Sequence, residues 1–337
     1  MTVFFPPCDK NGLRLGLGGA PLGNLFTAVS DADAQALVDA AWASGCRSFD
    51  TAPHYGHGLS EKRLGDALRS RPRDAFVLSS KVGRVLTPDA HAPRDQHGYV
   101  DVLPFTQAWD FSAAGTRRSV NDSLQRLGLA RLDVAYVHDP DAANHGASAS
   151  DVMRQVIEET LPALQQLKNE GLVGAIGLGT NDVDVVLQVL RHADLDVLML
   201  AGRYSLLDHS ALPALLPQCV ARGVRVALGG VFNSGILATG VRQSSGACPT
   251  FNYAPAAQEW VQRTAQIESV CKAHGVPLRA AALQFPLAHA AIDIVMLGAR
   301  TATEWLDAQA MLQHPVTQDF WADLRAQGLL PADAPTP

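Results

Sequence analysis

Short apolar runs alternate with longer amphipathic segments along most of the chain. The apolar runs are rich in Val, Ile and Leu and read as continuous stretches, which is typical of parallel strands buried on both faces. Strands are therefore expected at 15–19, 47–51, 76–82, 132–138, 173–178, 197–200, 224–228 and 292–297. Apolar residues at helical spacing predict helices over 31–44, 60–69, 115–127, 152–169, 183–191, 212–222, 256–274, 278–287 and 303–312.

Regular alternation of about eight strands with helices predicts a (β/α)8 barrel. Ser30 is a suitable N-cap for the first helix, and no Pro/Ser-rich linker divides the chain, so a single domain over 1–337 is expected. The main alternative is a doubly wound Rossmann sheet, whose glycine fingerprint opens a helix directly after the first strand. Here segment 15–21 ends in a proline and a further loop follows, which disfavours that alternative.

Two long segments, 83–113 and 229–255, interrupt the pattern after expected strands. In a barrel both lie on the C-terminal face, where binding and catalytic sites are built. The last residues, 328–337, are rich in Pro and Ala, and we expect them to be loose.

Composition narrows the class of protein. The chain of 337 residues carries a net charge of −6 without a Lys/Arg cluster, which argues against nucleic acid and membrane partners. Its five cysteines are scattered and lack a CxxC spacing, so neither a disulfide framework nor a structural zinc site is expected. No signal peptide or bilayer-spanning run is recognised, and the expected location is cytoplasmic.

Four polar residues fall at or just after the ends of three neighbouring strands. Asp50 ends the second strand, Tyr55 lies in its loop, and Lys81 and His138 lie near the ends of the next two. Each residue alone has an ordinary structural explanation, such as a cap or a satisfied core histidine. A lysine within an apolar strand is costly unless it is paired, and Asp50 is its natural partner.

This combination suits proton transfer to or from an oxygen during hydride transfer. A tyrosine has a pKa of about 10, and a nearby ammonium favours the phenolate and lowers that pKa. A carboxylate fixes the ammonium, and an imidazole can hydrogen-bond the substrate oxygen.

Segments 49–65, 79–83, 123–133 and 136–138 together resemble the aldo-keto reductase superfamily, and the resemblance extends from residue 16 to about residue 310. It implies a (β/α)8 barrel in which Tyr55 is the general acid/base, Lys81 and Asp50 tune it, and His138 orients the substrate. Segments 138–141, 201–208, 229–237 and 284–289 are similar to the aldose 1-dehydrogenase branch, which includes L-fucose and L-galactose dehydrogenases.

The resemblance implies oxidation of an aldose of L-fucose, L-galactose or D-arabinose type at C1 to the lactone. Pyridoxal 4-dehydrogenase is an alternative with similar segments. An alternative of another class is a non-catalytic regulatory subunit that kept the barrel and its cofactor. The expected partner in the leading interpretation is a small sugar.

The resemblance also implies a nicotinamide cofactor at the strand ends. Its expected contacts are Thr180 or Asn181, Gly229, Gly298, Arg300 and Glu304. Glu304 stands near the position where NADP-preferring members carry an arginine, and a carboxylate there favours a free ribose hydroxyl and therefore NAD. Arg300 keeps one positive charge, which leaves NADP possible. A simpler explanation, without a role in cofactor choice, is that Glu304 is an exposed acidic residue at the N-terminus of a helix, where the helix dipole favours a negative charge.

Three further residues are candidates for the substrate pocket. His54 flanks Tyr55, Trp109 lies in the first long loop, where packing is an equally good explanation, and Phe232 lies in the second. No metal site is expected, because the histidines near Tyr55 lack the spacing of a ligand motif.

Overall fold

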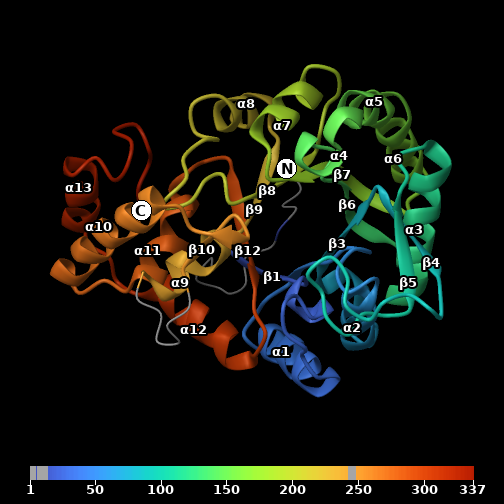
Figure 1. Ribbon diagram of the computed structural model, residues 1–337, viewed down its shortest axis with the longest axis horizontal. Helices are drawn as coiled ribbons and strands as arrows, with labels where there is room; N and C mark the ends of the chain where they lie inside the picture. Colours follow the sequence, from blue (N-terminus) through green and yellow to red (C-terminus); the bar gives the residue numbers. More distant parts are fainter. Residues whose placement is uncertain (1–4, 6–13, 242–247) are drawn as a thin grey trace.

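Eight parallel strands close into a barrel in the computed structural model, as the sequence predicts (Figure 1). The structure describes residues 5, 14–241 and 248–337. Around the barrel the strands are β1 (Leu15–Gly18), β12 (Ile292–Gly298), β9 (Arg225–Gly229), β8 (Val197–Ala201), β7 (Val173–Thr180), β6 (Leu132–His138), β3 (Val77–Val82) and β2 (Ser48–Asp50). All their carboxyl ends therefore meet on one face.

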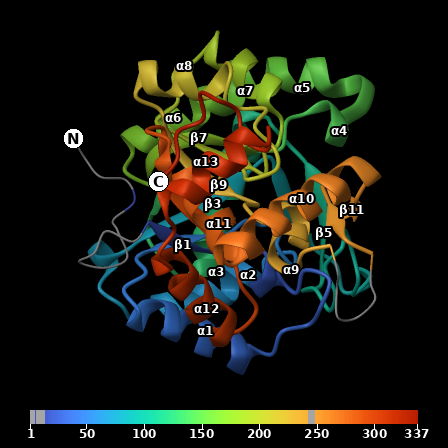
Figure 2. The same cartoon turned by 90° about the vertical axis from the view of Figure 1, so that its left-hand side faces the viewer.

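Helices surround the strands in both views (Figures 1 and 2). The helices that follow barrel strands are α1 (Asp31–Ala43), α2 (Leu59–Leu68), α3 (Ala113–Leu127), α5 (Ala149–Gln155), α6 (Leu161–Asn169), α7 (Val183–Leu190), α8 (Leu215–Arg222), α10 (Gln258–His274), α11 (Leu278–Gln284) and α12 (Ala302–Gln313). The side chain of Ser30 accepts a hydrogen bond from the Asp33 amide at 3.0 Å, so it caps α1 as expected. A π-helical turn, η4 (Val156–Thr160), joins α5 to α6 within one predicted helix.

The remaining helices are short or terminal. They are α4 (Ala142–His145), α9 (Ile236–Thr239) and α13 (Gln318–Ala326), with 3-10 turns η1 (Pro21–Gly23), η2 (Arg73–Ala75), η3 (Gly146–Ser148), η5 (Asn233–Gly235) and η6 (Phe285–Ala288). None of the described helices is both long and apolar enough to cross a membrane.

The core has two parts because the strands are buried on both faces. A large cluster fills the layer between strands and helices, and a smaller one fills the barrel interior. The interior cluster consists of Phe5, Val134, Tyr136, Ala175, Val197, Met199, Ala227, Ile294 and Met296. This packing fills the lower barrel, so any site must lie above it, at the carboxyl ends of the strands.

Both long loops contain hairpins that the hydrophobic pattern did not predict. The first holds β4 (Arg84–Pro88) and β5 (Phe105–Trp109), paired antiparallel with Arg84 opposite Trp109, and it packs beside α3 (Figure 1). The second holds a shorter hairpin, β10 (Thr250–Phe251) and β11 (Ala254–Pro255). Because the loops follow β3 and β9, both hairpins stand over the carboxyl face of the barrel.

The end of the chain differs from the loose segment that we expected. Leu329, Leu330 and Ala334 are buried, and the Arg325 guanidinium donates a hydrogen bond to the Ala334 carbonyl at 2.9 Å. Although the segment is rich in Pro and Ala, its two leucines are buried and hold it against the rest of the protein.

Candidate active site

Three of the four predicted catalytic side chains stand on adjacent strands. Asp50, Lys81 and His138 come from the carboxyl ends of β2, β3 and β6, which are neighbours in the barrel. The Lys81 ammonium lies 2.7 Å from Oδ2 of Asp50 and donates a second hydrogen bond to the Thr51 carbonyl at 2.9 Å. Both side chains are almost completely buried. The pairing expected from the sequence is therefore present.

Tyr55 reaches the same point from the loop between β2 and α2. The loop backbone lies against η1 so closely that a Cβ on Gly23 would stand 2.4 Å from the Tyr55 carbonyl carbon. Gly56, with a φ of +66°, makes the reciprocal contact. As a result the Lys81 ammonium lies 4.6 Å from the centroid of the Tyr55 ring, and the His138 ring lies 6.0 Å from it. All four predicted groups converge.

The electrostatics around Tyr55 differ from the sequence expectation. Burial raises the pKa of its phenol well above the ordinary value, and the carboxylates of Asp50 and Asp139 raise it further, whereas the Arg84 guanidinium lowers it. Burial likewise raises the pKa of Asp50, although Lys81 and the hydroxyl of Ser79 oppose that shift. Tyr55 is therefore a neutral phenol at rest, which holds its proton tightly and can accept another only after losing its own.

His138 is held as a neutral imidazole. Burial lowers its pKa well below the ordinary value, and the positive charges of Arg84 and Lys81 lower it further. Its Nε2 lies 3.4 Å from Oδ2 of Asp139. Its buried Nδ1 has no hydrogen-bond partner among the described residues. A neutral imidazole carries one N–H donor, which can orient an oxygen atom without adding charge.

The three predicted substrate residues are placed differently. His54 belongs to the site: its Nδ1 hydrogen-bonds Oε1 of Gln107 at 2.9 Å, and its ring lies 6.0 Å from that of His138. Trp109 is 39% exposed, and its ring centroid lies 4.1 Å from the Arg84 guanidinium. It therefore contacts the site through Arg84 and not through Tyr55 or His138. Phe232 instead packs against the outer core of the barrel, and no described contact joins it to Tyr55 or His138.

Sequence reasoning assigned no role to two charged residues that lie in the site. Arg84 begins β4, three residues after Lys81, and Asp139 directly follows His138. Both residues lie within or beside the motifs on which the family resemblance rests. Their proximity in sequence to Lys81 and His138 could therefore have identified them as site residues. Tyr99, an uncharged residue of the first long loop, also lies in the site, because its ring stacks on Tyr55 with centroids 6.1 Å apart.

The predicted cofactor contacts lie at the carboxyl ends of β7, β9 and β12. The Thr180 hydroxyl accepts a hydrogen bond from the Asp182 amide at 3.1 Å and contacts Asp141, whereas the Asn181 side chain is partly exposed. A Cβ on Gly229 would contact only Ala201, at 3.8 Å, so there is free space above the backbone at this strand end. Bare strand ends beside an accessible amide fit a flat nicotinamide ring and its carboxamide.

Arg300 and Glu304 stand together at the start of α12, beyond Gly298. Oε2 of Glu304 accepts a hydrogen bond from the Arg300 amide at 2.8 Å, and Thr301 caps the helix. The two side chains also form a half-exposed ion pair at 3.6 Å. The free amide groups of the first turn, together with one arginine, fit a phosphate group. The carboxylate is thus engaged with its own helix, in line with the simpler explanation for Glu304.

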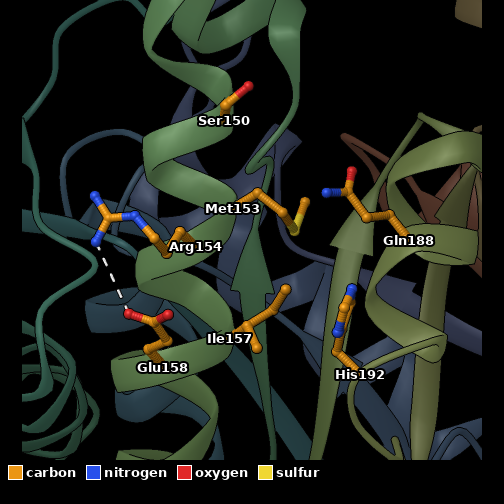
Figure 3. A pocket seen from close by; sticks show the side chains of 7 residues that line it. All are labelled: Ser150, Met153, Arg154, Ile157, Glu158, Gln188 and His192. Carbon is orange, nitrogen blue, oxygen red and sulfur yellow. Dashed lines mark ion pairs between the residues drawn. The ribbon is translucent and has the colours of Figure 1, made fainter.

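A separate hollow lies on the outer surface between α5, η4 and α7 (Figure 3). Its volume is about 270 Å³, and its lining residues are Ser150, Met153, Arg154, Ile157, Glu158, Gln188 and His192. Arg154 and Glu158 at its edge form an ion pair at 3.8 Å. None of these residues belongs to the cluster around Tyr55, so the hollow is not part of the candidate active site.

A barrel whose strand ends hold a buried Lys–Asp pair under a tyrosine defines an enzyme class that transfers protons and hydride. The model of the Aldo/keto reductase family matches residues 14–327. The chain belongs to that family and is an NAD(P)-dependent oxidoreductase.

Curated relatives cover nearly the whole chain. It is 40% identical to a D-threo-aldose 1-dehydrogenase from a Pseudomonas species, with 94% of each chain covered. It is also 40% identical to a pyridoxal 4-dehydrogenase from Microbacterium luteolum, again with 94% of each covered. L-galactose dehydrogenase of Arabidopsis thaliana is 32% identical, with 88% of this chain and 83% of the relative covered.

Solved structures agree on the fold. A glycerol dehydrogenase from Gluconobacter oxydans superposes with a TM-score of 0.73 at 21% identity, covering 99% of this chain and 98% of the other. An aldo-keto reductase from Bacillus halodurans gives a TM-score of 0.70 at 24% identity, covering 95% and 93%. At these identities the likeness concerns the barrel alone.

The Lys81–Asp50 pair generates a prediction on stability. Asp50→Asn leaves a buried ammonium without its carboxylate, so we expect the free energy of unfolding to fall by about 3 kcal/mol. Urea denaturation at pH 7.5 measures the change. Asp66→Asn is the control, because Asp66 pairs with Lys62 on the exposed face of α2 at 3.0 Å; we expect a loss of at most about 1 kcal/mol there. Equal losses in both variants would contradict the prediction.

Proposed function

We propose that the protein oxidises an aldose at C1 to the lactone with an NAD(P)+ cofactor. The observation that carries the proposal is the convergence of Tyr55, Lys81, Asp50 and His138 at the carboxyl face, with distances of 2.7 Å for the ion pair and 4.6 Å from the ammonium to the tyrosine ring. Two of the relatives, the D-threo-aldose and the L-galactose dehydrogenases, bear names of aldose oxidation.

In the proposed reaction each of the four residues has one task. Tyr55 accepts the proton of the C1 hydroxyl group as the bond between C1 and its hydrogen breaks. His138 donates a hydrogen bond to the same oxygen and fixes its position. Lys81 stabilises the phenolate, and Asp50 holds the lysine in place. NAD(P)+, when bound, supplies the acceptor for the hydride that leaves C1.

We propose that the cofactor lies across the ends of β7, β9 and β12. Asn181 is the better candidate for the carboxamide, because Thr180 is already engaged by Asp141 and Asp182. Gly229 leaves space for the ring. The turn around Gly298 and Arg300 holds the phosphates, since the amides of α12 begin there.

Oxidation of pyridoxal is the alternative within the same class. Its support is the identity of 40% to pyridoxal 4-dehydrogenase, equal to that of the aldose enzyme. Pyridoxal can form a cyclic hemiacetal, whose hydroxyl group is equivalent to the anomeric hydroxyl of a sugar. The same four residues could therefore catalyse its oxidation.

A screen of NAD+ and NADP+ reduction distinguishes the two substrates. The purified protein is assayed with L-fucose, L-galactose, D-arabinose and pyridoxal, and we expect an aldose to give the highest kcat/KM. Fastest turnover of pyridoxal would favour the alternative, and absence of turnover with every aldose would exclude the proposed function.

Tyr55→Phe tests whether the site is catalytic or only binds the cofactor. Removal of the proton acceptor should reduce kcat by about a hundredfold or more while cofactor binding, measured by fluorescence titration, stays unchanged. Tyr99→Phe is the matched control, since it removes a buried phenol stacked on the same ring, and we expect at least half of the activity to remain. Unchanged turnover in Tyr55→Phe would contradict the role assigned to Tyr55, whereas cofactor binding without turnover in the wild-type protein would support the regulatory, non-catalytic alternative.

The raised pKa of Tyr55 predicts the pH dependence of oxidation. Because the phenol is protonated at neutral pH, the fraction that can accept a proton grows about tenfold per pH unit below that pKa. The kcat for oxidation should therefore rise continuously from pH 7 to pH 10, whereas residual activity of Tyr55→Phe should lack this rise. A maximum of kcat near pH 6 would contradict the assigned role.

The cofactor preference is proposed to be NAD. Glu304 places a carboxylate beside Arg300 and partly neutralises the only charge in this turn that would attract a 2′-phosphate. We expect kcat/KM for NAD+ to exceed that for NADP+ by about tenfold or more, and Glu304→Gln to reduce the ratio. Glu259→Gln, in the first turn of α10, is the control. A preference for NADP+ in the wild-type protein would contradict this prediction.

A further inference from the structure

A second ion pair, between a buried arginine and a partly buried aspartate, lies beside the candidate site. Nη2 of Arg84 lies 3.1 Å from Oδ2 of Asp139, and the arginine is only 7% exposed. The pair joins the first residue of the β4–β5 hairpin to the residue after β6. Desolvation makes a buried pair a poor source of stability, so its presence beside reacting groups calls for an explanation.

The backbone fixes the Asp139 carboxylate. Asp139 has a φ of +49°, in the left-handed region. Its amide donates to the Gly179 carbonyl at 2.9 Å, and its own carbonyl accepts a hydrogen bond from Nε2 of His145 at 3.1 Å. These two contacts hold the uncommon conformation, and the conformation directs the carboxylate toward Arg84 and His138. Such strain is typical of functional positions.

Both members of the pair retain free hydrogen-bonding groups. Oδ1 of Asp139 has no hydrogen bond within the described residues, and the side chain remains 25% exposed. Nε of Arg84 is buried and also lacks a partner among those residues. Trp109 covers the guanidinium at 4.1 Å and leaves fewer ways for water to reach it. An available acceptor beside an available donor matches a hydroxyl group, which both donates and accepts.

The position of the pair relative to the reacting atoms limits which hydroxyl it can bind. Oδ2 of Asp139 lies 3.4 Å from Nε2 of His138, the residue proposed to hold the reacting oxygen. Charges of the pair also reach the phenol, since Asp139 raises and Arg84 lowers the pKa of Tyr55. Oxygens on adjacent carbons of a sugar lie about one hydrogen-bond length apart, near 2.8 Å. A hydroxyl group on the neighbouring carbon is therefore within reach of the carboxylate when His138 binds the reacting oxygen.

We propose that Asp139 and Arg84 bind the hydroxyl group on the carbon next to the reacting carbon and so select substrates that carry one there. The inference rests on the proposed oxidation at C1, for which this group is the C2 hydroxyl. The Asp139 carboxylate accepts a hydrogen bond from this hydroxyl group. Arg84 holds the carboxylate in place and donates a hydrogen bond to the hydroxyl oxygen.

The test compares two substrates in two proteins. The substrates are the aldose that the wild-type protein oxidises fastest and its 2-deoxy form, and the proteins are the wild type and Asp139→Asn. Loss of a charge-assisted hydrogen bond should lower kcat/KM for the parent aldose by about tenfold or more in the variant. For the 2-deoxy aldose the two proteins should agree within about twofold, because the contact is already missing.

Folding of the variant is controlled separately. Asparagine tolerates a left-handed backbone, and burial already raises the pKa of Asp139 to about 6, so a neutral side chain suits the position. Asp133→Asn is the matched control: Asp133 pairs with Arg73 at 2.7 Å at the opposite end of β6. It should leave the kcat/KM ratio of the two sugars unchanged. Melting temperatures of both variants show whether either loss reflects unfolding.

The outcomes separate this inference from the proposed function. No aldose oxidation by the wild-type protein removes the proposed function, and this inference with it. Aldose oxidation with an equal loss on both substrates in Asp139→Asn would overturn the inference alone, because Asp139 would then act by positioning His138. Wild-type protein that oxidises the 2-deoxy and parent aldoses equally well would also overturn it.

Discussion

The rest of the site depends on one buried interaction, the ion pair between Lys81 and Asp50. An ammonium in an apolar strand is tolerated only beside a carboxylate, and the parallel register sets Asp50 of β2 opposite Ser79 of β3, two residues before Lys81. The same lysine then faces the Tyr55 ring. The barrel fixes this geometry because two adjacent strands supply the pair. The position of the Lys81 ammonium therefore does not depend on the conformation of a loop.

The strands and the pair were predictable because both follow from local rules. Continuous apolar runs mark buried parallel strands, and an isolated lysine within one requires a partner. The β4–β5 hairpin was not predictable, since its residues, from Arg84 to Trp109, are mixed in polarity and pair across a long connection. The direction of the pKa shift of Tyr55 differed from the expectation for a related reason: its largest cause is burial, which depends on how distant segments pack, and the carboxylates of Asp50 and Asp139 add to it.

The two sides of the carboxyl face differ in chemistry. Around Tyr55, segments from β3, β4 and β6 bring charged side chains into a buried space. At β7, β8 and β9 the strand ends carry the uncharged residues Thr180, Ala201 and Gly229. A flat aromatic ring needs area and few charges, whereas a small polar molecule needs directional partners. The division of the face therefore matches a cofactor on one side and a hydroxylated substrate on the other.

The Arg84–Asp139 pair also shows how polar recognition can stand beside a proton-transfer group. A lone carboxylate next to Tyr55 would raise the pKa of the phenol and oppose its use as a base, and a lone guanidinium would lower it. Held 3.1 Å apart, the two charges act on the pKa of Tyr55 with opposite sign. The pair can thus present an acceptor and a donor to a substrate close to the phenol, while the Lys81 ammonium stays 4.6 Å from the centroid of the Tyr55 ring.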